Sequence, residues 1–253
     1  DAERLLLAQI RQPHLGLCLD PATLHLVELA RDLDAAPGRI DRQGLGWAFT
    51  PGERIEALDH APPGSVHRQS FAARQALLAL DPAAWPGPVW DACAGRGNKT
   101  RILRELGKTV YASDVHAGRI RALRREQPDV PAFLARADRP CPLKAAPGAI
   151  LLDAPCSGLG TLARRPAIKH HRTRRDAEAM ARTQARMLDA AWSSLAPGGR
   201  IAYLTCTLNP AENEDQVAAF LARTPGAEEL TRFATPPASP LGEFFFASLI
   251  AKP

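Results

Sequence analysis

The segment Val89-Trp-Asp-Ala-Cys-Ala-Gly-Arg-Gly-Asn-Lys-Thr100 decides the fold class. Its apolar start predicts a strand over Pro88–Ala92, and its end predicts a helix over Thr100–Leu106. Gly95 and Gly97 stand between the two, where residues without a Cβ let the backbone approach a ligand closely. A strand, a glycine-containing turn and a helix in succession indicate a βα unit whose loop can bind a ligand.

This loop differs from the two common nucleotide-binding patterns. A phosphate-binding P-loop needs glycine directly before the lysine, but Asn98 precedes Lys99. Thr100 stands where a dinucleotide fingerprint has its third glycine. Asp114 follows at about the distance of an acid that binds ribose hydroxyls. The pattern favours a nucleoside cofactor without phosphates, while a plain turn between strand and helix is the alternative.

Strands and helices continue to alternate after this unit, which predicts an α/β fold with a mostly parallel sheet. Further strands are expected over Thr109–Ala112, Ala132–Ala135, Ala149–Leu152, Arg200–Leu204 and Phe244–Ile250. Further helices are expected over Arg68–Leu80, His116–Glu126 and Asp176–Leu195, and after a cap at Asn209. Because ligands bind at the carboxyl ends of such strands, the segments of interest are Asp91–Thr100, Asp114, Asp138, Asp153–Gly160 and Thr205–Asn209.

The first 60 residues have a different pattern. Short amphipathic helices are expected over Glu3–Ile10 and Ala22–Leu33, and Ala35–Gly52 is expected to form a loop or short strands. The segment Ala61-Pro62-Pro63-Gly64 is the most linker-like stretch. We therefore expect a small module over 1–60 and a larger domain over 61–253.

Composition and charge limit the class of protein. Hydrophobic residues make up 45% and charged residues 23% of the 253 residues, as in ordinary globular proteins, and no apolar run suits a membrane span. Five cysteines without a CxxC pair argue against a disulfide framework or a zinc site, and indicate a reducing compartment, the cytoplasm. The net charge of +5 suits a polyanion such as RNA, although arginine-rich composition without binding is an alternative.

Two cysteines follow expected strands. Cys156 lies in Asp153-Ala-Pro-Cys-Ser-Gly-Leu-Gly160, where proline and glycine favour a shaped loop. Cys206 lies in Tyr203-Leu-Thr-Cys-Thr-Leu-Asn209, close to an expected helix N-terminus that favours a thiolate. A thiolate can act as a covalent nucleophile. Position alone leaves a packed core thiol as an equal alternative for each.

Together, these segments resemble the Sun-type RNA cytosine-5 methyltransferases, the nucleolar-protein/Sun family. The resemblance covers roughly residues 64–253. Its most specific blocks are the Asp153 segment followed by Arg-Pro-x-Ile-Lys at Arg165–Lys169, and Thr-Cys-Thr-Leu-Asn-Pro-x-Glu-Asn-Glu at Thr205–Glu214. It implies a Rossmann-like S-adenosylmethionine-dependent methyltransferase fold whose last strand is antiparallel, an RNA substrate with ribosomal RNA favoured over transfer RNA, and a monomer.

The resemblance also assigns roles to residues. Cys206 would attack carbon 6 of cytosine, Cys156 would assist release, and Asp153 would stabilise protonated nitrogen 3 with support from Lys99. The methyl donor would be held by a set of residues around the first loop and the strand ends: Cys93, Ala94, Gly95, Arg96, Gly97, Asp114, Asp138 and Asp153. No metal is expected. The 1–60 module would be of the kind this family uses to grip RNA.

The first loop departs from the family pattern, which usually reads Cys-Ala-Ala-Pro-Gly-Gly-Lys-Thr. Arg96 replaces its proline and Asn98 replaces a glycine. Asparagine tolerates positive φ better than most residues, but the change puts cofactor affinity in question. It also motivates an alternative, a catalytically weak RNA-binding or assembly factor on the same fold. A nicotinamide-dependent oxidoreductase is a further alternative, against which the missing third glycine and the thiol pair argue.

A run of basic residues follows the Cys156 segment. Phosphate contacts are expected from Arg164, Arg165, Lys169, His170 and Arg172, and a second basic cluster comprises Arg119, Arg121, Arg124 and Arg125. A solvated surface is the alternative. Beside a site for cytosine, contacts with RNA phosphates are favoured. The base must also be splayed out of its stack to reach such a site.

Overall fold

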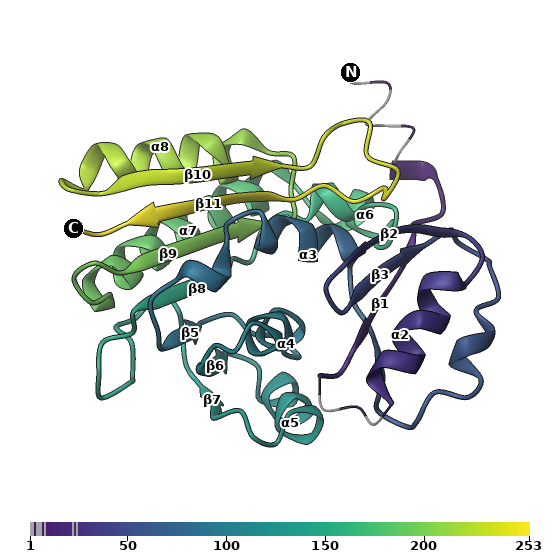
Figure 1. Cartoon of the computed structure of the whole chain (residues 1–253). Coiled ribbons are helices and arrows are strands. Elements are labelled where there is room, and N and C mark those ends of the chain that lie inside the picture. Colours follow the sequence, from purple (N-terminus) through teal and green to yellow (C-terminus); the bar gives the residue numbers. More distant parts are fainter. Residues whose placement is uncertain (1–2, 4–6, 8, 22, 24) are drawn as a thin grey trace.

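The computed structural model describes residues 3, 7, 9–21, 23 and 25–253. Within them the strands form two sheets (Figure 1). The four-stranded sheet, in the order β2-β3-β1-β4, is antiparallel and comprises β1 (Leu15–Leu19), β2 (Arg39–Gln43), β3 (Gly46–Phe49) and β4 (Val66–Arg68). The seven-stranded sheet has the order β10-β11-β9-β8-β5-β6-β7.

The larger sheet is mostly parallel, as the alternation of elements predicts. Its strands are β5 (Val89–Asp91), β6 (Val110–Asp114), β7 (Ala132–Leu134), β8 (Ala149–Asp153), β9 (Arg200–Thr205), β10 (Glu228–Ala234) and β11 (Phe246–Ala251). The pairs among β5 to β9 are parallel. β11 inserts antiparallel between β9 and β10, which confirms the expected direction of the last strand.

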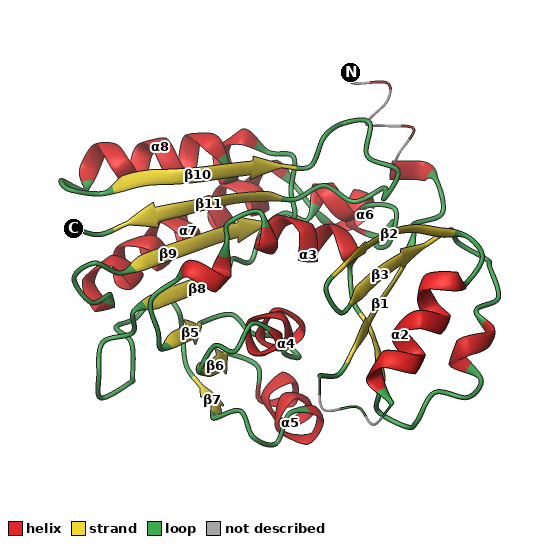
Figure 2. Cartoon of the chain, in the orientation of Figure 1, coloured by secondary structure: helices red, strands yellow, loops and turns green. Residues whose placement is uncertain are grey.

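Helices cover both faces of this sheet (Figure 2). α3 (Phe71–Leu78), α4 (Asn98–Glu105) and α5 (Ala117–Glu126) lie on one face, and α7 (Arg174–Ser194) and α8 (Glu214–Arg223) on the other. Alternate residues of β8 point to opposite faces: Leu151 packs in the core with Phe71 of α3, and Leu152 in the core with Leu188 of α7. The apolar run Ala149–Leu152 is therefore buried on both sides, as expected.

The small N-terminal sheet packs against α2 (Leu26–Ala35), with Leu33, Trp47 and Phe49 fully buried between them. Half of the residues of the expected helix over Glu3–Ile10 lie outside the described residues, as do two residues of the helix expected over Ala22–Leu33. Residues 26–33 of that second helix are helical and belong to α2, which ends two residues later than expected.

The sequence did not predict β1, and it placed the start of α3 too early, at Arg68. Arg68 belongs to β4, which pairs with β1, so the small sheet extends past the linker-like segment at 61–64. α3 begins at Phe71, because the Ser70 hydroxyl accepts a hydrogen bond from the Ala73 N–H and caps the helix.

A buried ion pair joins the small sheet to the helices of the larger domain. Arg74 of α3 donates to both oxygens of Glu105 at the end of α4, at 2.5 and 2.7 Å. Arg74 Nε also donates to the Gln43 carbonyl at 2.7 Å, and Glu105 accepts the N–H of Leu45 at 2.8 Å. The turn between β2 and β3 is thereby fixed on α3 and α4.

Two features of the C-terminal part differ from expectation. Asn209 caps a short 3-10 turn, Pro210–Glu212, and the α-helix α8 begins only at Glu214. β10 was not predicted, because this edge strand is largely exposed and lacks an alternating apolar pattern. Among the helices of the described residues, none combines the length and the apolar character needed to cross a membrane.

Candidate active site

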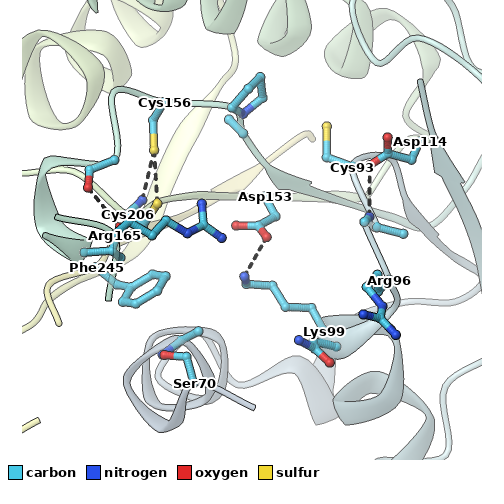
Figure 3. A pocket seen from close by; sticks show the side chains of 18 of the residues that line it. Ser70, Cys93, Arg96, Lys99, Asp114, Asp153, Cys156, Arg165, Cys206 and Phe245 are labelled. Atoms are coloured by element: carbon cyan, nitrogen blue, oxygen red, sulfur yellow. Dashed lines mark hydrogen bonds and ion pairs between the residues drawn. The ribbon is translucent and has the colours of Figure 1, made fainter. Parts of the chain in front are cut away.

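A cavity of about 690 Å³ opens at the carboxyl ends of β5, β6, β8 and β9 (Figure 3). This is the edge where the topology predicts a ligand. Most of the residues proposed for the site line it: Cys93, Ala94, Gly95, Arg96, Lys99, Asp114, Asp153, Cys156, Arg164, Arg165, Arg172 and Cys206. Segments distant in sequence thus meet around one space.

Cys156 and Cys206 are in direct contact. Their Sγ atoms lie 3.4 Å apart, and the backbone N–H of Cys206 donates to Cys156 Sγ at 3.3 Å. The hydrogen bond from Cys156, helped by the charges of Lys99 and Arg165, lowers the pKa of Cys206. The same hydrogen bond, together with burial, raises the pKa of Cys156 well above the ordinary thiol value. Cys206 is therefore the thiol that ionises first.

The cause of this lowered pKa differs from the one expected. The sequence suggested a helix N-terminus after Asn209, but a 3-10 turn follows that residue instead. The neighbouring thiol and the cations across the cavity stabilise the thiolate.

Lys99 and Asp153 form an ion pair beside the cysteines, with 2.6 Å between Lys99 Nζ and Asp153 Oδ2. Burial opposes the charge on Lys99, but the charge and hydrogen bond of Asp153 outweigh it and raise the pKa of the lysine. Figure 3 shows this pair between the two thiols on one side and Cys93 and Asp114 on the other. The site therefore holds a fixed carboxylate and a fixed ammonium group next to a nucleophile.

The glycine loop keeps its shape despite its unusual sequence. Gly95 and Gly97 have φ of 59° and 85°, in the left-handed region that favours glycine. Asn98 is the first residue of α4 and does not have a positive φ, so the expected need for asparagine's tolerance there is wrong. Arg96 is largely exposed and pairs with Glu126. Neither replacement distorts the turn.

Asp114 and Gly95 together form a surface that suits a nucleoside. Asp114 Oδ2 accepts the Gly95 N–H at 3.0 Å, and its Oδ1 accepts the His116 N–H at 2.8 Å, so the carboxylate is fixed at the cavity wall. A Cβ built on Gly95 would meet none of the described atoms within 4 Å, which leaves room for a ligand against the backbone. A fixed carboxylate therefore lies beside backbone that a ligand can approach closely.

Asp91 lies beneath this loop and is fully buried. Its Oδ2 accepts the Thr100 hydroxyl at 2.6 Å, while its Oδ1 has no hydrogen-bond partner among the described residues. Burial raises the pKa of Asp91 to about 7. This carboxyl is thus a proton-binding group under the cofactor loop.

Four residues proposed for the site do not line the cavity. Gly97 lies behind the loop, where its carbonyl accepts a hydrogen bond from Gln127. Asp138 is nearly buried and paired with Arg136 and Arg186. The others, Lys169 and His170, are exposed on the short helix α6 (Ile168–His171).

The basic residues beside the cavity differ in their partners. Arg164 forms an ion pair with the buried Glu243 at 2.7 Å and donates to the His14 carbonyl at 2.8 Å. The guanidinium group of Arg165 forms neither a hydrogen bond nor an ion pair with the described part of the chain, and the residue lines the cavity. The Arg165 side chain is therefore available to a ligand, while that of Arg164 links Glu243 to the segment around His14.

Several residues that motifs did not reveal complete the cavity wall. Ser70 donates to Glu243 Oε2 at 2.8 Å, and Phe245 places its ring centroid 5.7 Å from Lys99 Nζ. These residues come from segments that the sequence marked only as a helix start and an apolar strand. No local signal distinguishes them, because their place depends on how distant segments meet.

The sheet order, the antiparallel β11 and a cavity beside a glycine loop define a Rossmann-like methyltransferase domain. A family model described as 16S rRNA methyltransferase RsmB/F matches residues 76–243. The chain belongs to this family, which is the Sun family of S-adenosylmethionine-dependent methyltransferases.

Relatives of known name agree with this membership. The chain is 39% identical over 203 residues to ribosomal RNA small subunit methyltransferase B of Xanthomonas campestris pv. campestris, covering 76% of this chain and 44% of that protein. It is 40% identical over 204 residues to the protein of the same name from Xylella fastidiosa, covering 77% and 48%. The chain therefore spans about half the length of these relatives.

Solved structures show the same fold. A methyltransferase homologue from Pyrococcus horikoshii superposes with a TM-score of 0.80 at 25% identity, over 100% of this chain and 90% of that one. NSun6 from Pyrococcus horikoshii with SFG superposes with a TM-score of 0.76 at 17% identity, over 99% and 94%, which supports the fold alone. Among the described residues, no cluster of three or more histidine, cysteine or acidic side chains could hold a metal ion.

Proposed function

We propose that this chain methylates carbon 5 of cytosine in RNA, through a covalent bond between Cys206 and the base. The observation that carries the proposal is the contact of the two thiols beside the Lys99–Asp153 pair at the wall of the cavity. Carbon 5 of cytosine is a weak nucleophile, and addition of a thiolate at carbon 6 activates it. A thiol of lowered pKa next to a fixed carboxylate and ammonium suits that addition.

The roles of the side chains follow from the order of bond changes. Cys206 Sγ bonds to carbon 6, and the electrons displaced toward nitrogen 3 are stabilised by a proton shared with Asp153, which Lys99 holds in place. Carbon 5 then takes the methyl group, and the donor would leave as a neutral thioether. Loss of the carbon-5 proton to a base restores the double bond and expels Cys206 Sγ as a thiolate. Cys156 assists this release, since its Sγ is the thiol adjacent to the nucleophile.

S-adenosylmethionine supplies an electrophilic methyl group when bound. The residues that would hold it are Asp114 for the ribose and the Cys93–Gly97 loop for the methionine end, and the proposal places Asp138 near the adenine. The role of Asp138 has the least structural support of these, because its carboxylate is already paired with Arg136 and Arg186. Because Gly95 and Gly97 retain their positive φ, the loop gives no support to the alternative of a catalytically weak assembly factor.

The substrate that we propose is ribosomal RNA, favoured over transfer RNA by the names of the relatives. Arg165 and Arg172 reach the cavity and suit phosphate contacts, while Lys169 and His170 offer basic groups nearby. The N-terminal module, residues 1–60 with β4 completing its sheet, would grip RNA next to the catalytic domain of 61–253. We propose that the chain acts as a monomer in the cytoplasm.

The test is transfer of a labelled methyl group from S-adenosylmethionine to ribosomal RNA that lacks its own modifications, followed by bisulfite sequencing. The proposal predicts methylation at carbon 5 of one or a few cytosines in the small-subunit RNA. Methylation confined to transfer RNA would correct the substrate. A protein that binds the cofactor and RNA but leaves every cytosine unmethylated would overturn the reaction.

A further inference from the structure

A carboxylate outside the cavity joins the two cysteine segments. Glu212 is fully buried, and its oxygens accept four hydrogen bonds. Two come from Ser157, the neighbour of Cys156: its N–H donates to Oε2 at 2.8 Å and its hydroxyl to Oε1 at 2.5 Å. The others come from Gln184 Nε2 to Oε2 and from Asn209 Nδ2 to Oε1, each at 3.0 Å.

These contacts link both loops through one side chain. Ser157 belongs to the Cys156 segment and Asn209 to the Cys206 segment. Gln184 of α7 makes a further contact with the Cys156 segment, because its Nε2 also donates to the Pro155 carbonyl at 2.9 Å. A direct bridge accompanies them, with 2.7 Å between the hydroxyls of Ser157 and Thr207.

The chemistry of this carboxylate is unusual. All four donors are neutral, and they occupy the roughly four acceptor positions that a carboxylate offers. Burying a charge that no cation neutralises is costly. A carboxamide at the same position would accept at one oxygen and turn an N–H₂ group toward a donor.

We propose that Glu212 is a positioning residue that sets the distance between Cys206 and Cys156, so that the thiol that assists release lies against the nucleophile. Glu212 does not line the cavity and acts through Ser157 and Asn209. The catalytic meaning of this distance rests on the proposed function, but the distance itself can be measured without catalysis.

The experiment compares Glu212→Gln with Asp215→Asn in the full chain. Asp215 is an exposed acid in the first turn of α8 and serves as the matched control. Each protein is treated with diamide, which takes two electrons and two protons from a pair of thiols and leaves a disulfide. The rate at which the Cys156–Cys206 link forms is followed by peptide mass spectrometry.

Glu212→Gln is expected to slow the link about tenfold or more, since misplacement by an ångström can cost two orders of magnitude in rate. The control is expected to keep the parent rate. Removal of a negative charge does not disfavour a nearby thiolate, so slowing of the reaction identifies geometry as the cause. In methyl transfer, kcat should fall about tenfold or more while KM for RNA stays within about twofold, because the residue touches no ligand.

Gln184→Met provides a second test if Glu212→Gln does not fold. It removes one bond to Glu212 and the bond to the Pro155 carbonyl outside the cavity. Parent rates of disulfide formation in a folded Glu212→Gln or in Gln184→Met overturn the inference. Slowed disulfide formation in a chain whose parent never methylates cytosine supports the inference and rejects the proposed function, so the two failures are distinguishable.

Discussion

The Sγ atoms of Cys156 and Cys206 lie 3.4 Å apart, although 50 residues separate them in the chain. β8 and β9 are neighbouring parallel strands, and each cysteine follows the end of one of them. The same register brings Asp153, the last residue of β8, opposite Leu204 of β9. A pair of adjacent strands thus brings a thiol of lowered pKa, a second thiol and a carboxylate to one edge of the sheet.

Replacement of each cysteine should stop the reaction at a different stage. Cys206→Ala should abolish both methyl transfer and any covalent RNA adduct, because no thiolate remains to attack. Cys156→Ala should accumulate a protein–RNA adduct that survives denaturing electrophoresis, because release is blocked. Cofactor binding, measured by calorimetry, should stay within about twofold of the parent value for both. An adduct in Cys206→Ala and none in Cys156→Ala would reverse the assignment.

Lys99→Met should make Cys206 less reactive near neutral pH. The charge of Lys99 helps to lower the pKa of Cys206, and without it the charge of Asp153, which raises that pKa, is opposed less strongly. Because the thiolate is the reactive form, the pH profile of its alkylation by iodoacetamide should move to higher pH, and the rate measured near pH 7 should fall about tenfold. Site-resolved mass spectrometry measures the rate of alkylation at Cys206, with the distant Cys141 as the internal reference. An unchanged pH profile for Cys206 would contradict the electrostatic argument.

Asp91→Asn should flatten the dependence of stability on pH. The pKa of Asp91 is raised from 3.8 to about 7 in the folded chain, so between these values the folded state binds more protons than the unfolded state. Stability from this group is therefore lost as pH rises from about 4 to 7, by on the order of 4 kcal/mol. Urea unfolding at several pH values should show this slope in the parent and a smaller one in the variant. Equal slopes would mean that Asp91 ionises normally.

The two glycines of the cofactor loop should respond differently to alanine. Both substitutions meet unfavourable backbone conformations, at about 1–2 kcal/mol each. A Cβ at residue 97 would in addition lie 2.4 Å from Gln127 Nε2, whereas one at residue 95 meets only open space among the described atoms. Gly97→Ala should therefore lower the melting temperature more. Gly95→Ala should chiefly weaken S-adenosylmethionine binding in calorimetry, because its Cβ would enter the cavity, and the reverse ranking would refute this distinction.

Substitution of Arg164 should mainly lower stability, whereas substitution of Arg165 should mainly weaken RNA binding. Arg164→Ala removes the guanidinium that pairs with the buried Glu243 and should cost roughly 1–3 kcal/mol in urea unfolding. Arg165→Ala should leave stability unchanged, weaken RNA binding, and reduce the slope of log affinity against log salt by about one. Fluorescence anisotropy at several salt concentrations measures the latter. Equal effects of the two variants on that slope would show that Arg164 also contacts phosphate.

Much of the larger domain could be predicted from the sequence, because its signals are local. The apolar run at Ala149–Leu152 and the glycine turn at 95–97 each mark their element within a few residues. β4 and β10 were missed because a three-residue strand and an exposed edge strand are specified by their partners rather than by their own pattern, and β1 was missed although it is apolar and mostly buried. The glycine loop shows the limit of position-by-position reasoning, since Asn98 proved to be helical.

The sequence by itself determined which residues can do chemistry: the two cysteine segments, Asp153, Lys99 and the glycine loop are all present in local patterns. Only the tertiary structure decided how they act together. In the folded chain, contacts with Cys156, Lys99 and Arg165 lower the pKa of Cys206. Arg164 is paired with Glu243, whereas Arg165 lines the cavity. The physical reason is that hydrogen bonds, burial and charge act over a few ångströms in space, and strand pairing sets those distances between residues far apart in the chain.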